Sequence, residues 1–101
     1  MDDFFRQRLA ELRNQKGVSA RDMSLSLGQS ESYINKIENG KAYPSMQVFF
    51  YICDYLEVTP RDFFDVENHN PVRLEELIND IRALNNQQIA CIACIVKELK
   101  R

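Results

Sequence analysis

The residues best suited to nucleophilic or metal chemistry are Cys91 and Cys94, which form a C-x-x-C pair, and His69, the only histidine of the chain. Such a cysteine pair can bind zinc or carry out thiol redox chemistry. A structural zinc site needs four ligands, and the sequence offers no second cysteine pair. A redox pair usually begins a helix, whereas these cysteines lie inside the apolar run 89–96. We therefore expect no metal site.

Catalytic constellations are also missing from the sequence. His69 lies in a segment that resembles a linker, and there is no glycine-rich phosphate loop and no Ser-His-Asp arrangement. Three cysteines cannot all pair within one chain, which fits a reducing cytosol. No catalytic residue and no cofactor are therefore predicted, and the chain is not expected to be an enzyme.

A membrane location is not expected either. The chain has no apolar run long enough to span a bilayer. Its start, Met1 to Phe5, lacks the basic end and apolar core of a signal peptide. The sequence predicts a cytoplasmic protein.

Polar side chains that can hydrogen-bond to other molecules gather around two short predicted helices. Ser19 is a good N-cap for the first of these, Met23 and Leu27 lie one turn apart on its inner face, and Gly28 can end it. Ser24 lies on the same face, where a small side chain allows a second helix to approach closely. This pattern predicts a tight helix crossing.

The second short helix is predicted over residues 30–38. Ser30 would cap it, and Ile34 and Ile37 would be buried together with Tyr33. The outer face would then carry four polar residues: Glu31, Ser32, Asn35 and Lys36.

The rest of the chain also shows helical periodicity. Helices are predicted over about 3–16 and about 45–57, with a short one after Thr59 and Pro60. After a linker over 65–71, the apolar residues of 74–84 and 89–99 keep the helical period on either side of an Asn-Asn turn. We predict an all-α protein that ends in a two-helix hairpin.

These features resemble the phage-repressor and Cro type of helix-turn-helix domain, also called the xenobiotic-response-element (XRE) family. The resemblance rests on Ser19 to Lys41 and on flanking residues that follow the family's order and spacing: Leu9, Leu12, Arg13, Gly17, Pro44, Ser45, Phe49, Ile52, Leu56 to Thr59, Phe63 and Phe64. It implies a five-helix, lambda-repressor-like DNA-binding domain over residues 1–67. Residues 68–101 would form the C-terminal helical hairpin.

In this family the second helix of the motif enters the DNA major groove. The resemblance therefore implies that double-stranded DNA is a partner, and it assigns these residues to DNA binding: Arg21, Ser30, Glu31, Ser32, Asn35, Lys36, Lys41 and Tyr43. It also implies a structural ion pair between Arg13 and Glu38. It further implies a buried thiol at Cys53, a position at which the family usually has a small apolar residue.

Two residues and the charge balance depart from the usual pattern. Ala20 replaces a glutamine that many members use to bind a phosphate, and the Glu31 carboxylate repels phosphates. Residues 1–68 carry eight Lys and Arg against eleven Asp and Glu, a balance of 8 − 11 = −3. The domain thus lacks the basic character on which DNA affinity usually depends.

Several alternatives remain open at this point. The leading prediction is a sequence-specific transcriptional regulator, expected to be a bacterial or phage repressor that binds as a homodimer. The others are a protein-interaction module with weak or no DNA binding, and the antitoxin of a toxin–antitoxin pair; both imply a protein partner. The C-terminal hairpin either dimerises or covers the core of its own monomer, where Phe50, Tyr51 and Tyr55 are expected outside the core.

Overall fold

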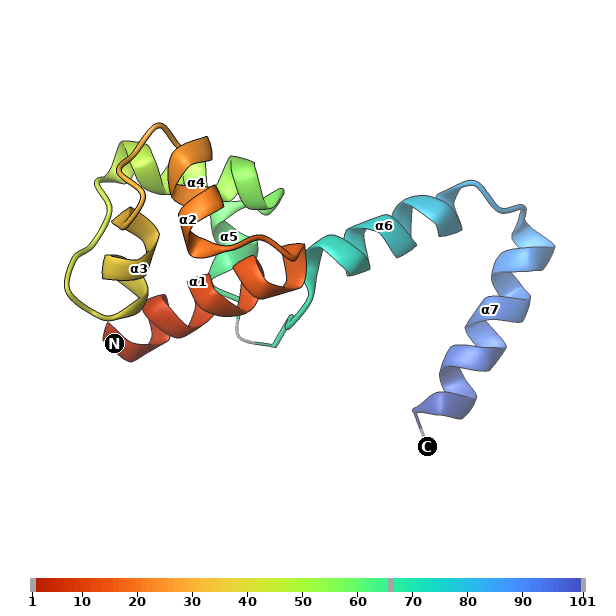
Figure 1. The fold of residues 1–101 in the computed structure, drawn as a ribbon. Helices are drawn as coiled ribbons and strands as arrows, with labels where there is room; N and C mark the ends of the chain where they lie inside the picture. The colour runs from red at the N-terminus through yellow and green to blue at the C-terminus, as the bar shows by residue number, and fades with distance from the viewer. Residues whose placement is uncertain (1, 66, 101) are drawn as a thin grey trace. The chain divides into compact units, whose positions relative to one another are not determined.

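The computed structural model describes residues 2–65 and 67–100, and every regular element in these ranges is an α-helix (Figure 1). The predicted all-α class is confirmed. In chain order the helices are α1 (Asp2–Lys16), α2 (Ala20–Ser26), α3 (Tyr33–Glu38), α4 (Met46–Leu56), α5 (Pro60–Phe63), α6 (Pro71–Arg82) and α7 (Asn86–Leu99).

Side-chain hydroxyls begin three of these helices. Ser19, Ser45 and Thr59 each accept a hydrogen bond from the backbone N–H three residues later, at 3.0 to 3.2 Å. These bonds satisfy donors that a helix start leaves without a partner. Gly28 and Gly40 have φ values of 72° and 74°, and both follow the end of a helix. The predicted N-cap Ser19, the predicted helix end at Gly28 and the predicted helix start after Thr59 are confirmed.

Helix α3 is shorter than the predicted helix over residues 30–38. It begins at Tyr33, and the backbone carbonyl of Ser30 accepts from the Tyr33 N–H at 3.0 Å, which makes residues 30–33 a turn. Ser32 is the N-cap residue, but its side chain makes no capping hydrogen bond. The prediction that Ser30 caps this helix was therefore wrong. A tertiary contact from α2 satisfies one of the free N–H groups instead.

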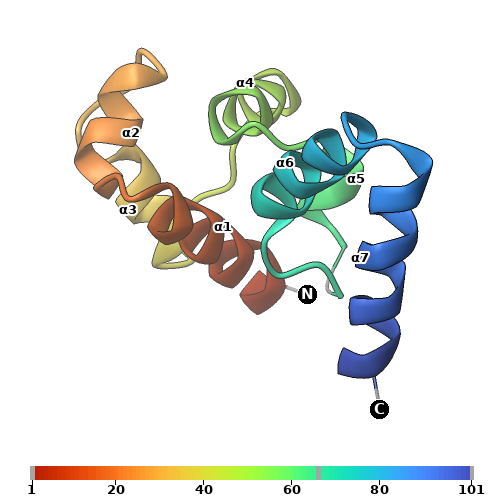
Figure 2. The same cartoon turned by 90° about the vertical axis from the view of Figure 1, so that its right-hand side faces the viewer.

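That contact is made by Ser24, which is fully buried where α2 meets α3. Its hydroxyl donates to the carbonyl of Ala20 at 2.7 Å and accepts from the N–H of Ile34 at 2.9 Å. Met23, Ile34 and Ile37 are buried around it, and Figures 1 and 2 both show α2 and α3 side by side. Ser24 thus permits the close approach and also bonds the two helices together.

Aromatic rings fill the space between α1, α4 and α5. The Phe5 ring centroid lies 5.1 Å from that of Phe63 and 5.9 Å from that of Phe49. Helix α4 buries four residues, Phe49, Ile52, Cys53 and Leu56. Cys53 is buried, as expected. Phe50 and Tyr51 are exposed, as expected, whereas Tyr55 is half-buried.

The segment after α5 is fixed to α1 by Arg8, whose side chain is buried. Its guanidinium pairs with Glu11 and donates to four backbone carbonyls at 2.8 to 3.2 Å, those of Asp62, Phe63, Asp65 and Asn68. Gln15 also donates to the carbonyl of His69. The predicted linker therefore has defined contacts as far as residue 69.

The chain divides into two compact units, residues 1–71 and 72–101. The first unit contains α1 to α5. The second contains almost all of α6 and the whole of α7, which we call the C-terminal helix pair. Its second helix begins with a capping box, in which Asn85 and Gln88 each bond the other's backbone N–H. Helix α7 has no buried residue.

Candidate nucleic-acid interface

Helix α3 has one buried and one exposed face. Ile34 and Ile37 are buried against α2 and α1, whereas Asn35 and Lys36 are exposed. Tyr33, which was predicted to be buried with the two isoleucines, is half-exposed. The Asn35 side-chain oxygen accepts a 3.3 Å hydrogen bond from the side-chain amide of Asn39. This leaves the Asn35 amide group accessible for contacts with a base edge, and Lys36 lies beside it in sequence.

The turn before α3 carries the other predicted base-contacting residues. Ser30 and Glu31 are exposed and Ser32 is half-exposed, so all three lie at the start of the α3 outer surface. The Glu31 carboxylate accepts from the Nε of Arg21 at 3.2 Å, and both side chains are about two-thirds exposed, at 67% and 64%. This pairing was not predicted from the sequence, in which the two residues lie 10 positions apart.

The loop after α3 holds Lys41 and Tyr43. Lys41 is exposed, and its backbone N–H donates to the carbonyl of Lys36 at 2.9 Å, which fixes the chain direction after α3. Tyr43 is 59% exposed, and its ring lies edge-on to Phe5 at a centroid distance of 6.0 Å. The backbone of Lys41 and the ring of Tyr43 are therefore positioned by the folded unit, and both side chains are exposed.

An ion pair fixes α3 relative to α1. The Arg13 guanidinium donates to both carboxylate oxygens of Glu38, at 2.7 and 2.9 Å, and to the carbonyl of Val18 at 2.9 Å. Only 15% and 12% of the two side chains are exposed. The hydrogen bonds to Glu38 raise the pKa of Arg13 despite its burial. This pair contacts the end of α3 and leaves its outer face clear.

Half of the lysines and arginines of the first unit form an ion pair with a carboxylate. Four of its arginines form ion pairs, namely Arg6 with Asp3, Arg8 with Glu11, Arg13 with Glu38 and Arg21 with Glu31. Among the described residues, Lys36 and Lys41 lie on or next to α3 without such a partner. The candidate interface thus depends on a small number of charges.

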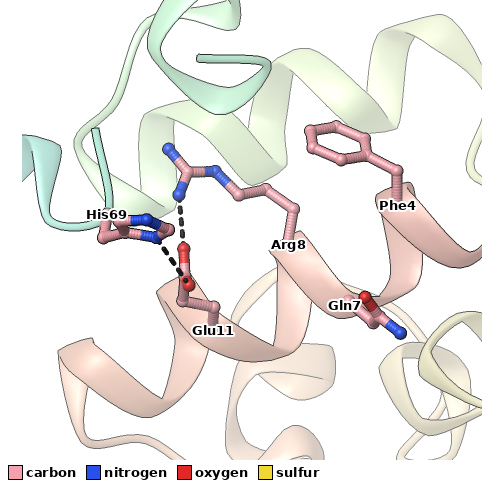
Figure 3. Close-up of a pocket in the computed structure, with 5 residues that line it drawn as sticks. All are labelled: Phe4, Gln7, Arg8, Glu11 and His69. Atoms are coloured by element: carbon pink, nitrogen blue, oxygen red, sulfur yellow. Dashed lines mark hydrogen bonds and ion pairs between the residues drawn. The ribbon is translucent and has the colours of Figure 1, made fainter. Parts of the chain in front are cut away.

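A pocket of about 140 Å³ lies elsewhere on α1, lined by Phe4, Gln7, Arg8, Glu11 and His69 (Figure 3). Its volume is below the roughly 300–1,000 Å³ of typical small-molecule sites. The His69 Nδ1 lies 3.4 Å from a Glu11 oxygen, and Glu11 also pairs with Arg8. These polar groups thus bond one another rather than leaving a free reactive group.

The described residues provide neither a candidate metal site nor a helix that could span a membrane. They contain no group of three or more His, Cys, Asp or Glu side chains that could hold a metal ion. All three cysteines are free: Cys53 is buried, and Cys91 and Cys94 are exposed. None of the described helices has the length and apolarity needed to cross a bilayer.

The arrangement of α2, the turn and α3 defines a helix-turn-helix protein. A family model described as helix-turn-helix matches residues 9–63, which includes most of α1 and all of α2 to α5. The chain belongs to this family, in its XRE-type, Cro/repressor-like form. The family consists of DNA-binding regulators and is not an enzyme family. No curated protein and no solved structure shows a significant match to the chain.

Proposed function

We propose that this protein is a sequence-specific transcriptional regulator that inserts α3 and the turn before it into the DNA major groove. The observation that carries the proposal is the exposed polar face of α3, a helix that the rest of the first unit holds in place. Asn35 and Lys36 project from a helix whose other face is buried and whose end is held by Glu38. An asparagine can read adenine and a lysine can read guanine at the edges of base pairs.

Backbone contacts would come from the ends of this surface. Lys41 and Arg21 are the cations best placed to bind phosphates, and Tyr43 can add a hydroxyl contact. Ser30 and Ser32 can hydrogen-bond to bases or phosphates, and the Glu31 carboxylate can accept from a cytosine amino group. With so few cations, one copy would bind DNA weakly, because affinity depends on phosphate neutralisation.

Weak binding by one copy is the reason to propose a homodimer. Two copies related by a two-fold axis read two half-sites about one helical turn apart, which adds the contacts of both. Such a dimer would act as a repressor when its operator overlaps a promoter, because occupancy alone blocks transcription. A regulator of this kind works in the cytoplasm and carries out no catalysis.

One observation favours a second candidate, a protein-interaction module without DNA affinity. The pairing of Arg21 with Glu31 withdraws a cation from the interface and places a carboxylate there. An antitoxin that binds both a protein and its promoter would combine the two functions. We favour the DNA-binding function because Asn35, Lys36 and Lys41 are all exposed.

The direct test is selection of bound duplexes from a randomised DNA library at low salt. We expect enrichment of a palindrome with half-sites about 10 bp apart. Lys36→Ala should weaken binding to the enriched duplex, whereas Lys16→Ala should not. Lys16 is a matched control because it lies on α1, with its ammonium 5.1 Å from the centre of the Tyr55 ring. No enrichment by folded protein would contradict the proposal and favour the interaction module.

A further inference from the structure

The most unusual surface of the chain lies on the C-terminal helix pair. No residue from Ala83 to Val96 is charged. Large apolar side chains of α7 are nevertheless exposed, from 36% for Ile92 to 80% for Leu99. Exposed apolar surface on this scale marks an interaction site in a soluble protein.

The apolar residues of both helices form stripes. At 100° per residue, the large apolar residues of α7 share an arc of about 120°: Ile89, Ile92, Ile95, Val96 and Leu99. In and just after α6, five more occupy an arc of similar width: Leu74, Leu77, Ile78, Ile81 and Leu84. Residues 89, 92, 96 and 99 also follow the alternating three- and four-residue spacing of helices that pack side by side.

The length of the unit indicates that it needs a partner. Residues 72–101 form a compact unit of their own, and units below about 40 residues usually need disulfides, metals or oligomerisation for stability. Cys91 and Cys94 are free, and the described residues contain no candidate metal cluster. The described residues thus provide neither a disulfide nor a metal site in this unit, which leaves association with another apolar surface as the means of stabilisation.

Charge and area both favour a second copy of the chain as the partner. Residues 72–101 carry five Lys and Arg and four Asp and Glu, so two copies do not repel each other strongly. The same balance offers little attraction to a strongly charged partner. From their exposed fractions, the large apolar residues of the pair present on the order of 600 Å², against about 800 Å² per partner in a standard interface.

We propose that two copies of this chain associate through α6 and α7 to form a four-helix bundle, with the two apolar stripes of each copy at its centre. The proposal deepens the proposed function, since it names the surface that would join two DNA-binding units. Cys91 and Cys94 lie outside the α7 stripe and stay accessible in this bundle.

The test is the molar mass of the full-length protein in solution, measured by light scattering over a range of concentrations. We expect twice the chain mass of 11.8 kDa for the wild type. Ile92→Glu places a charge in the α7 stripe and should halve the mass. Ala90→Glu is the matched control, because it places the same charge on the opposite side of α7 and should leave the dimer intact. Leu77→Glu in α6 should also give a monomer.

Circular dichroism of each variant checks that the first unit still unfolds cooperatively at the wild-type temperature. A wild type that stays monomeric at all concentrations would overturn the proposal, and it would favour cover of the stripes within the same chain or by a different protein. A dimer that Ile92→Glu and Leu77→Glu both leave intact would also overturn it, by placing the interface elsewhere. Because the measurement uses no DNA, its failure is distinct from a failure of DNA binding.

Discussion

We expect Glu31 and Arg21 to influence DNA binding together, because their side chains form one ion pair at the edge of the candidate interface. Each residue alone suggests a simple role, with arginine binding a phosphate and glutamate repelling one. As a pair they are close to neutral, so Arg21 must leave Glu31 before it can bind DNA fully. We therefore expect Glu31 to weaken the general attraction to DNA and to leave more of the affinity to base contacts.

Glu31→Gln should accordingly strengthen binding to DNA of any sequence. Releasing Arg21 for one phosphate contact should steepen the log–log salt dependence of affinity by about 0.9 per protomer. Titrations of a fluorescent duplex at several salt concentrations measure this slope. An unchanged slope would mean that Arg21 makes no phosphate contact.

The ion pair of Arg13 and Glu38 has a structural role instead. Glu38→Gln should lower the free energy of unfolding by about 3 kcal/mol, the lower end of the range for breaking a buried pair, because the two side chains are 12–15% exposed. Glu31→Gln is the matched control, since it breaks an exposed pair and should cost no more than about 1 kcal/mol. Urea denaturation measures both. Equal losses in the two variants would contradict the structural role.

At the scale of single residues, the residues with a structural role could be predicted from the sequence better than the contacts that they make. The positions of Arg13 and Glu38 could be assigned from family resemblance, and the structure brings the two together. The bonds of Arg8 to four carbonyls could not be foreseen, because they join α1 to backbone more than 50 residues away. No local pattern carries that information.

At the scale of elements, the crossing of α2 and α3 depends on the hydroxyl of Ser24 as well as on its size. Ser24→Ala leaves the buried N–H of Ile34 without its acceptor, so we expect a loss of about 1–3 kcal/mol in unfolding free energy. Ser26→Ala, on the exposed side of the same helix, should change stability by less than about 0.5 kcal/mol. Thermal or urea denaturation compares them. A neutral Ser24→Ala would show that the hydroxyl is dispensable.

Helix α4 gives a pH-dependent prediction through Cys53. Burial, with a smaller effect of Asp54, raises the pKa of this thiol from 9.0 to about 11. The folded state therefore holds the proton more tightly between these pH values, and the unfolding free energy should fall as pH rises from 9 to 11, by up to roughly 1.4 kcal/mol per pH unit.

Urea denaturation at pH 8, 9, 10 and 11 tests this expectation. Cys53→Ala should have a shallower decline than the wild type, whereas Cys91→Ala should match the wild type because Cys91 is exposed. Identical declines in all three proteins would contradict the assignment of this effect to the buried thiol.

The boundaries of most helices could be predicted because local residues set them. Ser19, Thr59, Gly28 and Gly40 act through their own side chain or backbone conformation, which the sequence reveals directly. The start of α3 could not be predicted in this way. Its first turn is satisfied by Ser24 from another helix, so Ser30 resembles a cap in the sequence but does not act as one.

At the scale of the whole molecule, an acidic protein can still bind DNA if two copies each contribute phosphate contacts to the same duplex. Of the cations near the interface, Lys36 and Lys41 would provide about two phosphate contacts per protomer while Arg21 stays paired with Glu31. A dimer would then neutralise on the order of four phosphates, which corresponds to a salt slope of about −4. The C-terminal helix pair would supply the association.

The central claim is that α3 reads DNA sequence, and the most direct measurement compares affinities for the selected duplex and for a scrambled duplex of the same composition. We predict tighter binding of the selected duplex, and a loss of about 1–3 kcal/mol of that preference in Asn35→Ala with little change in binding to the scrambled one. Equal affinity of the wild type for both duplexes, or no measurable binding to either at low salt, would contradict the claim.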